Sequence, residues 1–239
     1  MTATLLASAA IIALASFVMG LSGFGIGLVA LAFLPWVMSP VLAIIVTTLY
    51  AMAFSIAMLW PLRREIEPVR LTLLLVGTLA GTPLGVWGLV ALPVSMITRL
   101  IGVVLIVIVA LEWFRFMPRL SAHGWGLGAG VMAGVLGGAI GTPGPPVVLY
   151  AATQGWNPRT MKANLLAFFI VNEGAILIGY WWANLLTPEV WSTTAVLALP
   201  ALVGVSAGVV LFNRIDAVRF RQVVYGVLFV SGVVLLLRG

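Results

Sequence analysis

The sequence predicts an all-α polytopic membrane protein with about eight to ten membrane helical segments. Of its 239 residues, 63% are hydrophobic and 8% are charged, and the mean hydropathy is +1.22. A soluble domain, by contrast, is about a quarter charged. Uncharged stretches close to the roughly 20 residues that cross a bilayer recur along the whole chain rather than at one anchor. A water-soluble globule is therefore excluded.

Charge and cysteine content narrow the range of partners. The net charge is +6 and the isoelectric point is about 10.8, but the basic residues lie between hydrophobic runs. Anionic lipid headgroups are therefore their expected partners, and nucleic acid is not. The chain has no cysteine, which excludes disulfides and thiolate chemistry. We expect no cofactor and no metal, and a homo-oligomer stays open.

Charged residues, proline and glycine divide the chain into ten predicted helices. The second, sixth and seventh are too short to cross unaided, and whether each crosses or forms a re-entrant hairpin stays open. The first run lacks the basic start of a signal peptide, so we expect it to remain in the fold. The predicted segments are Thr4–Gly20, Phe24–Met38, Pro40–Trp60, Val69–Leu92, Ile97–Met117, Trp125–Gly138, Pro143–Thr153, Thr160–Trp182, Val190–Phe212 and Val218–Leu237.

The basic residues are distributed unevenly between the two sides of these segments. Two of them, Arg99 and Arg238, fall on one side, and ten fall on the other. By the positive-inside rule the larger group is cytoplasmic, and both chain termini are then outside. The larger group consists of Arg63, Arg64, Arg70, Arg115, Arg119, Arg159, Lys162, Arg214, Arg219 and Arg221.

The two halves of the chain look related, which predicts one integral membrane domain built from two repeats, 1–120 and 121–239. Each repeat holds five segments, and an odd number makes the second repeat enter the membrane inverted, as in many secondary transporters. Chance matching of glycine-rich helices is the alternative. A shift of 114 residues places Gly20, Gly23, Ile26 and Gly27 over Gly134, Gly137, Ile140 and Gly141, and a shift of 123 residues places Gly81 and Gly85 over Gly204 and Gly208.

Two glycine-rich stretches, Gly20–Gly27 and Gly137–Pro146, predict interruptions of the helices. Glycine permits positive φ angles and close backbone approach, and the prolines of the second stretch, Pro143, Pro145 and Pro146, lack amide donors. Non-helical backbone persists in hydrocarbon only where protein or water satisfies its polar groups. The breaks therefore predict a polar cavity, and glycines that only allow close helix packing are the alternative.

The helix that restarts after each break offers a site for an anion. Its first amides are unpaired and lie at the positive end of the helix dipole. Gly25 and Gly27 would present such amides after the first break, and Thr142 and Gly144 after the second. If a two-fold axis in the membrane plane relates the breaks, their tips meet near mid-membrane. A small oxyanion could bind there, with the hydroxyl groups of Ser22 and Thr142 as further donors.

The eighth predicted segment carries three polar residues inside the membrane, Asn164, Asn172 and Glu173. An isolated buried carboxylate costs on the order of several kcal/mol, so Glu173 is expected to be protonated or paired. A proton-coupling role and a structural hydrogen bond or ion pair both stay open. Asn164 is a candidate substrate ligand. Lys162, with Arg159, either gathers an anion at the cytoplasmic mouth or extends to lipid phosphate.

At the two breaks the chain resembles the sulfite exporter TauE/SafE family of bacterial membrane transporters. The run Gly-Thr-Pro-Gly-Pro-Pro-Val-Val-Leu-Tyr, followed by Gly155-Trp-Asn-Pro and Lys162, is similar to the second-repeat signature of that family. The resemblance implies the bacterial inner membrane, two homologous halves and export of a small anion such as sulfite, thiosulfate or an organosulfonate. Leu28-Val-Ala replaces glycines that are common in the first motif, which leaves the substrate open. The residues carried over as substrate-binding are Gly23, Gly25, Gly27, Gly137, Gly138, Gly141, Thr142, Gly144 and Lys162.

Together these observations predict a secondary transporter of small sulfur-containing anions that works by alternating access, with proton coupling through Glu173. A passive anion channel and an accessory membrane subunit without transport of its own are the alternatives. An enzyme is not expected, because the one histidine, His123, lies in a predicted loop. The predicted segments also contain no paired carboxylates and no Gly-x-Ser-x-Gly motif.

Overall fold

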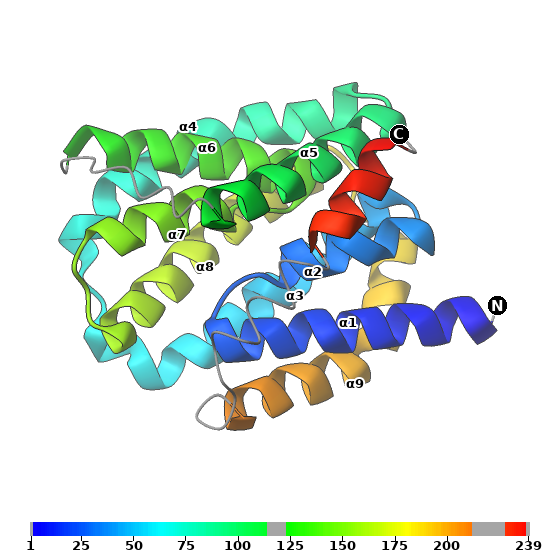
Figure 1. Ribbon diagram of the computed structural model, residues 1–239, viewed down its shortest axis with the longest axis horizontal. Helices are drawn as coiled ribbons and strands as arrows, with labels where there is room; N and C mark the ends of the chain where they lie inside the picture. The colour runs from blue at the N-terminus through cyan, green and yellow to red at the C-terminus, as the bar shows by residue number, and fades with distance from the viewer. Residues whose placement is uncertain (1, 114–122, 212–227, 238–239) are drawn as a thin grey trace. The chain divides into compact units, whose positions relative to one another are not determined.

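The computed structural model describes residues 2–113, 123–211 and 228–237, and this part of the chain is helical without strands (Figure 1). Two 3-10 turns, η1 (Leu34–Trp36) and η2 (Trp60–Glu65), follow α2 and α3. The α-helices are α1 (Thr2–Ser22), α2 (Ile26–Phe33), α3 (Pro40–Leu59), α4 (Pro68–Ala91), α5 (Val94–Trp113), α6 (His123–Ile140), α7 (Gly144–Thr153), α8 (Pro158–Trp182), α9 (Pro188–Leu211) and an unlabelled last helix, Leu228–Leu237.

Five of the described helices, α1, α3, α4, α8 and α9, are long and apolar enough to cross a membrane. This confirms the predicted all-α polytopic class. In contrast, α2 has 8 residues and α7 has 10. At 1.5 Å per residue they rise about 12 and 15 Å, well short of the roughly 30 Å hydrocarbon core. The predicted loop at His123 is wrong, because α6 begins there, two residues before the apolar run that starts at Trp125.

Proline sets the beginning of the long helices. Pro40, Pro68, Pro158 and Pro188 are the first residues of α3, α4, α8 and α9. Proline suits this position because the first amide of a helix has no helical acceptor and the ring holds φ near the helical value. The start of α8 also has a side-chain cap, since Asn157 accepts hydrogen bonds from two of the first backbone amides. α3 therefore begins at its predicted start, and α4, α8 and α9 begin one or two residues before theirs.

The chain divides into two compact units, which are described separately. The first unit contains α1, α2, the start of α3, α5, α9 and the last helix. The second contains the rest of α3 and α4, α6, α7 and α8. Each unit thus takes helices from both halves of the chain, so the predicted repeats 1–120 and 121–239 are not the compact units. Their relation as repeats stays a prediction.

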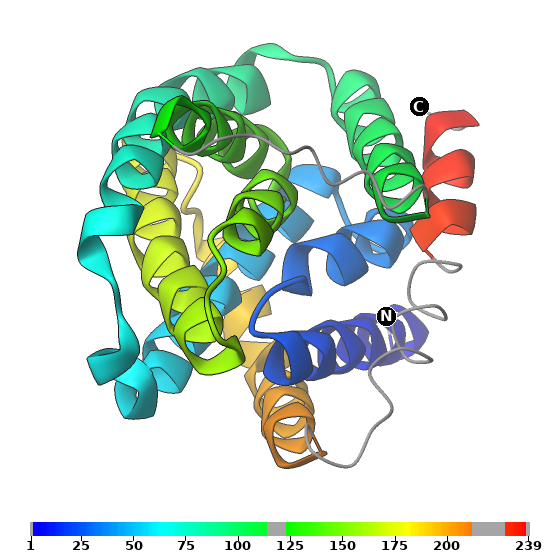
Figure 2. The same ribbon diagram turned by 60° about the vertical axis from the view of Figure 1, so that its left-hand side comes forward.

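In the first unit, α1 and α9 lie side by side and run parallel (Figures 1 and 2). Glycine allows the two backbones to meet. A Cβ atom added to Gly204 would lie 2.1 Å from the Ala13 carbonyl oxygen, and one added to Gly208 would lie 2.2 Å from the Phe17 carbonyl oxygen. Gly20 likewise faces the backbone of α9. The interface therefore requires small residues, as in tightly packed membrane helices.

In the second unit, α4 and α6 pack in the same way and also run parallel (Figures 1 and 2). Added Cβ atoms on Gly77, Gly81 and Gly85 would lie within 2.4 Å of carbonyl oxygens on successive turns of α6. The first turns of α6 also contact α7, since a Cβ at Gly126 would lie 3.1 Å from the Tyr150 ring. Because the start of α6 lies near the end of α7, these two helices form an antiparallel hairpin that returns the chain to one end of the unit.

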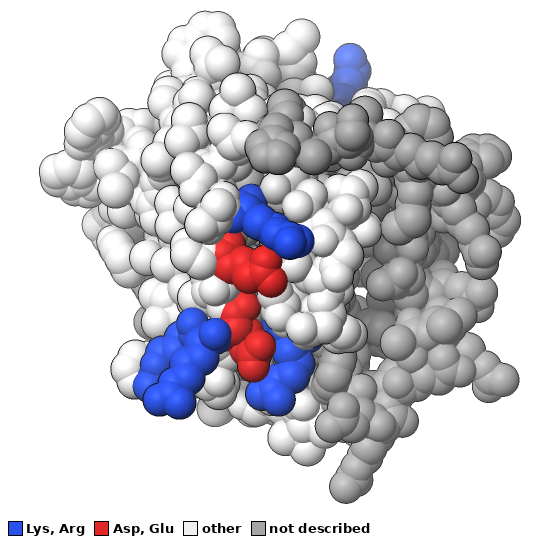
Figure 3. Space-filling view, turned by 90° about the vertical axis from the view of Figure 1, so that its left-hand side faces the viewer, with Lys and Arg blue, Asp and Glu red and all other residues white. Residues whose placement is uncertain are grey.

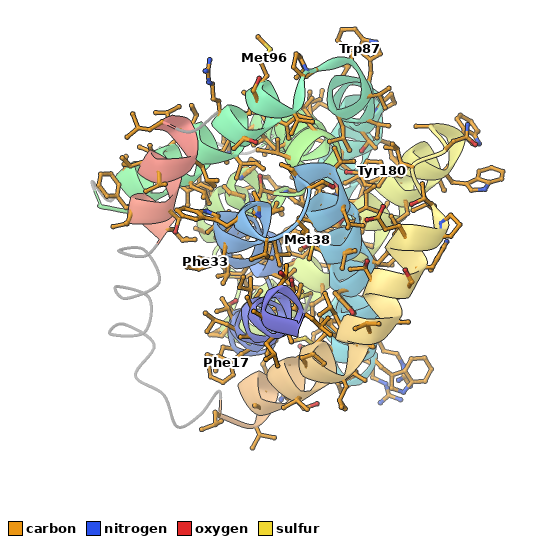
Figure 4. The ribbon with its side chains drawn as sticks, turned by 90° about the vertical axis from the view of Figure 1, so that its right-hand side faces the viewer. Phe17, Phe33, Met38, Trp87, Met96 and Tyr180 are labelled. Carbon is orange, nitrogen blue, oxygen red and sulfur yellow. The ribbon has the colours of Figure 1, made fainter. Side chains whose placement is uncertain are left out.

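The outer faces of the helices carry large apolar side chains. In α4, Leu84 is 61% exposed and Trp87 is 69% exposed, while the glycines of this helix are buried against α6. Figure 4 shows Trp87 projecting away from the ribbon. In α9, Leu199 and Val210 are each 71% exposed. Apolar side chains turned outward along whole helices fit a lipid environment.

Candidate functional site

The first break interrupts the chain between α1, which ends at Ser22, and α2, which begins at Ile26. Gly23 has a φ angle of 83° and Gly25 of 92°, both in the left-handed region that favours glycine. The Ser22 hydroxyl donates to the Phe24 carbonyl oxygen at 2.6 Å. This hydroxyl, which the sequence offers as an anion ligand, therefore has a local backbone partner that shapes the turn.

Backbone amides are the donors at the first break. The amides at the start of a helix have no acceptor one turn earlier, and Val29 is the first amide here to donate back, to the Gly25 carbonyl oxygen at 3.2 Å. The preceding residues Ile26, Gly27 and Leu28 are buried. They place their amides at the positive end of the α2 dipole, which suits an anion.

We expect Gly25→Ala to destabilise this break through backbone strain alone. The nearest atom to an added Cβ is Val18 Cγ1 at 3.6 Å, an ordinary contact, but the φ angle of 92° is unfavourable for alanine. Such strain costs on the order of 1–2 kcal/mol. A lower thermal unfolding midpoint of the purified protein checks the prediction, with Gly128→Ala as the control at an unstrained helical glycine. Equal midpoints for the two variants would contradict it.

The second break lies between α6, which ends at Ile140, and α7, which begins at Gly144. Gly141 has a φ angle of 63° and donates its amide to the Gly137 carbonyl oxygen at 2.9 Å. The Thr142 amide donates to the Leu136 carbonyl oxygen at 3.3 Å. The Thr142 amide thus closes the end of α6, whereas the sequence offers it to the anion.

The start of α7 has few backbone donors. Its first three residues are Gly144, Pro145 and Pro146, preceded by Pro143. Proline has no amide hydrogen, so Gly144 alone among these four can donate. Of the two amides that the sequence offers at this break, that of Thr142 is used by α6, and that of Gly144 stays a prediction.

The second break lies beside the middle of the longest helix of its unit. A Cβ added to Gly137 would lie 3.2 Å from Asn172 Nδ2 and 2.8 Å from Ile176 Cδ1. Asn172 is close to the midpoint of α8, which runs from Pro158 to Trp182. Because α8 is long enough to span the bilayer, the end of α6 reaches about half of that length.

Polar groups gather at this depth without bonding partners among the described residues. Thr142 is 2% exposed and its hydroxyl oxygen has no partner. The same holds for Asn172 Nδ2 and Glu173 Oε2, on residues that are 0–3% exposed. Each unsatisfied buried group costs about 1–3 kcal/mol, and native structures keep few of them. Such a set points to a bound polar ligand.

Neighbouring residues fix the geometry of this polar region. The Thr78 hydroxyl of α4 donates to the Asn172 Oδ1 atom of α8, and the Tyr180 hydroxyl donates to the Gly138 carbonyl oxygen at 2.9 Å. Neither Asn172 nor Thr78 was predicted from the sequence as a site residue. The feature that could have identified them is the presence of polar residues in otherwise apolar segments, where Thr78 and Thr82 lie one helical turn apart.

Gly138 belongs to the packing of the helices. A Cβ added there would lie 2.8 Å from the Val86 amide nitrogen and 3.0 Å from the Gly85 carbonyl carbon. The face of Gly138 on which a side chain would stand therefore contacts the backbone of α4. For this glycine, the alternative role of allowing close helix approach accounts for the contacts that the structure shows.

Lys162 and Asn164 lie away from the break, near the start of α8. Asn164 Oδ1 accepts a hydrogen bond from the Glu67 amide at 2.8 Å, at the beginning of α4. Eight helical residues separate Asn164 from Asn172, a rise of about 12 Å. The structure thus does not bring these two candidates to the polar groups at mid-helix.

The end of the second unit that holds Lys162 is also its charged end. Glu67 and Arg70 form an ion pair at 3.1 Å, and the Trp156 indole donates to the Glu67 carboxylate at 3.2 Å. Arg70 also donates to the Gln154 carbonyl oxygen at 2.9 Å. On the face shown in Figure 3, acidic and basic side chains gather in one area. Charge is therefore concentrated where η2, α4, α7 and α8 meet.

Long apolar helices around a buried polar break define a polytopic integral membrane protein of the transporter type. The family model for the sulfite exporter TauE/SafE matches residues 8–235, and the chain belongs to this family. Membership makes the protein a membrane transporter and indicates sulfur-containing anions as its substrates. No curated protein and no solved structure matches the chain.

Proposed function

We propose that the protein is a secondary transporter that exports a small sulfur oxyanion or organosulfonate by alternating access. The observation that carries the proposal is the end of α6 at half the length of α8, where the Thr142 hydroxyl is buried with no partner among the residues that the structure describes. A transported anion would satisfy such a group during passage. Family membership supports the sulfur-containing class of substrate.

In this proposal each break contributes different donors. After the first break, the α2 amides from Ile26 to Leu28 hold anion oxygens at the positive end of the helix dipole. After the second break, the Thr142 hydroxyl and the Gly144 amide do so. Uncharged donors suit a transporter, because the anion must bind and then leave.

Residues at the start and in the middle of α8 would control entry and coupling. Lys162 and Arg159, with Asn164 beside them, would gather anions at the charged end of the second unit. Glu173 is 3% exposed in the middle of the helix, and we propose that it carries the coupling proton. Buried ionisable groups in membrane helices commonly serve proton relays.

The inverted-repeat arrangement is supported by matching features in the two halves. One constant shift of 118 residues places the end of α1 on the end of α6, and the starts of α2 and α3 on those of α7 and α8. This is one helical turn more than the shift of 114 residues seen in the glycine pattern. The first helix of each half also packs on the fourth helix of the other half, α1 on α9 and α6 on α4. A two-fold relation between the halves would produce such an exchange.

The charged end of the second unit sets the proposed orientation. Five of the ten basic residues assigned to the cytoplasm are described, at η2 and at the starts of α4 and α8. The other five, Arg115, Arg119, Arg214, Arg219 and Arg221, lie outside the described residues. We propose that this end faces the cytoplasm, with the protein in the bacterial inner membrane and both termini outside.

Counterflow in proteoliposomes that contain only this protein tests the proposed function. Vesicles loaded with unlabelled sulfite, thiosulfate or an organosulfonate should accumulate the labelled anion transiently, because one carrier exchanges internal for external substrate. A passive channel would give flux that does not depend on a pH gradient and no counterflow. An accessory subunit would give no flux. Either result would overturn the proposal.

We expect Thr142→Val to weaken anion binding roughly 10- to 100-fold while the protein still inserts and folds. Valine has nearly the shape of threonine but lacks the hydroxyl, and loss of a hydrogen bond to a charged ligand costs about 1.5–3 kcal/mol. Binding of radiolabelled thiosulfate to the purified protein measures the effect. Thr153→Val is the matched control, because its hydroxyl donates to the Tyr150 carbonyl oxygen at the far end of α7. Unchanged affinity in folded Thr142→Val would remove this residue from the site.

A further inference from the structure

We propose that Asn172 binds the transported anion directly through its side-chain amide, and that Thr78 holds this amide in the binding orientation. Asn172 is thus a substrate ligand and Thr78 a positioning residue. The inference rests on the proposed function and deepens it, because neither residue belongs to the glycine and proline motifs of the two breaks. It identifies a side-chain donor contributed by α8.

The Asn172 amide is buried and has an open donor. The residue is 0% exposed, and its Nδ2 atom has no hydrogen-bond partner among the described residues. An unpaired buried amide destabilises a fold, so native proteins seldom keep one without a ligand or water to satisfy it. The donor therefore points to a polar species that occupies this part of the unit.

Gly137 places that donor at the break. A Cβ atom added to Gly137 would lie 3.2 Å from Asn172 Nδ2 and 3.1 Å from Pro143 Cβ. The Ile176 side chain packs on the same face, with its Cδ1 atom 2.8 Å from the added Cβ. The Asn172 amide therefore lies in the packed contact between α8 and the end of α6, beside the break.

Thr78 determines which end of the Asn172 amide is available. Its hydroxyl, on a residue that is itself 0% exposed, donates to Asn172 Oδ1. The amide oxygen, which would repel an anion, is thereby engaged by α4, and the nitrogen, beside the Glu173 side chain, is left as the donor for the ligand. Without the hydroxyl, the amide can rotate and present its oxygen instead.

The scarcity of backbone donors at α7 explains why a side chain is needed. Pro143, Pro145 and Pro146 have no amide hydrogen, so Gly144 is the one donor among the residues that begin this helix. An oxyanion has several oxygens to satisfy. The Thr142 hydroxyl and the Asn172 amide lie at the same break and supply donors that the prolines remove.

Binding of radiolabelled thiosulfate and sulfite to the purified full-length protein tests the inference. We expect Asn172→Leu and Thr78→Val to bind both anions roughly 10- to 100-fold more weakly, which is the usual cost of a lost hydrogen bond to a charged group. We expect Thr78→Ser to restore the affinity, because serine retains the hydroxyl. Thr82→Val is the matched control, because its hydroxyl donates to the Thr78 carbonyl oxygen at 2.7 Å and not to Asn172.

Folding is followed by size-exclusion chromatography and by the melting temperature without anion. Folded Asn172→Leu with wild-type affinity would overturn the inference, and so would Thr78→Ser that binds as weakly as Thr78→Val. If Asn172→Leu does not fold, the affinities of Thr78→Val and Thr78→Ser test the inference, because valine preserves the shape of threonine. A wild-type protein that binds neither anion would overturn the proposed function itself, and this inference with it.

Discussion

Gly130→Ala is expected to destabilise the second unit strongly. A Cβ atom at this position would lie 2.2 Å from the Leu74 carbonyl oxygen and 3.0 Å from Gly77 Cα. Both atoms belong to the backbone of α4, so no side chain can rotate away and the two helices must separate. Overpacking of this kind costs about 1–3 kcal/mol or more. We expect a low yield of monodisperse protein and a melting temperature lower by about 2–4 °C for each kcal/mol.

Gly128→Ala is the matched control for this prediction. It lies two residues away on the same helix, and the nearest atom to its added Cβ is Trp125 Cε3 at 3.9 Å. Alanine favours the helix over glycine by up to about 1 kcal/mol, so this variant should be as stable as the wild type or slightly more stable. If the two alanine variants have the same melting temperature, close packing of α4 against α6 does not stabilise the second unit.

Glu173→Gln is expected to abolish flux driven by a pH gradient while leaving counterflow intact. Glutamine keeps the size and hydrogen-bonding capacity of the side chain but cannot take up or release a proton. Binding and exchange of the anion should therefore continue, and coupled transport should fall to the level of protein-free vesicles. The measurement is uptake of labelled thiosulfate with and without an imposed pH gradient.

A second glutamate provides the control for the coupling role. Glu189 lies in the first turn of α9 and is exposed, so Glu189→Gln should retain pH-driven flux. If Glu173→Gln responds to the gradient as the wild type does, the carboxylate has a structural role, which the sequence also leaves open. Loss of counterflow together with coupled flux would also contradict the prediction, because binding would then require the carboxylate.

The helices were predictable because local residues determine their ends. Prolines begin α3, α4, α8 and α9, and glycines with positive φ follow α1 and α6. The choice of partner was not predictable from the same residues. A glycine such as Gly204 shows that a backbone can approach closely, but only the folded chain shows that the approaching backbone is that of Ala13.

The candidate site was predictable in part for a similar reason. The break near Thr142 follows from local glycine and proline chemistry, and this threonine is buried. Local sequence could not show that Asn164 bonds to the start of α4, or that Thr78 bonds to Asn172 across 94 residues. Such contacts depend on which helices face each other. The scarcity of amide donors at the start of α7 follows from the sequence alone, because Pro143, Pro145 and Pro146 lack amide hydrogens.

The pairing of α1 with α9 has a consequence for biosynthesis. At roughly 5–20 residues per second, the ribosome completes α9 about 10–40 s after it completes α1. During that delay the glycine face of α1 must be covered by lipid, by another nascent helix or by an insertion factor. The interval for α4 and α6 is several times shorter, since fewer residues separate them. A stalled or truncated chain should therefore expose the α1 face to quality-control proteases well before it exposes that of α4.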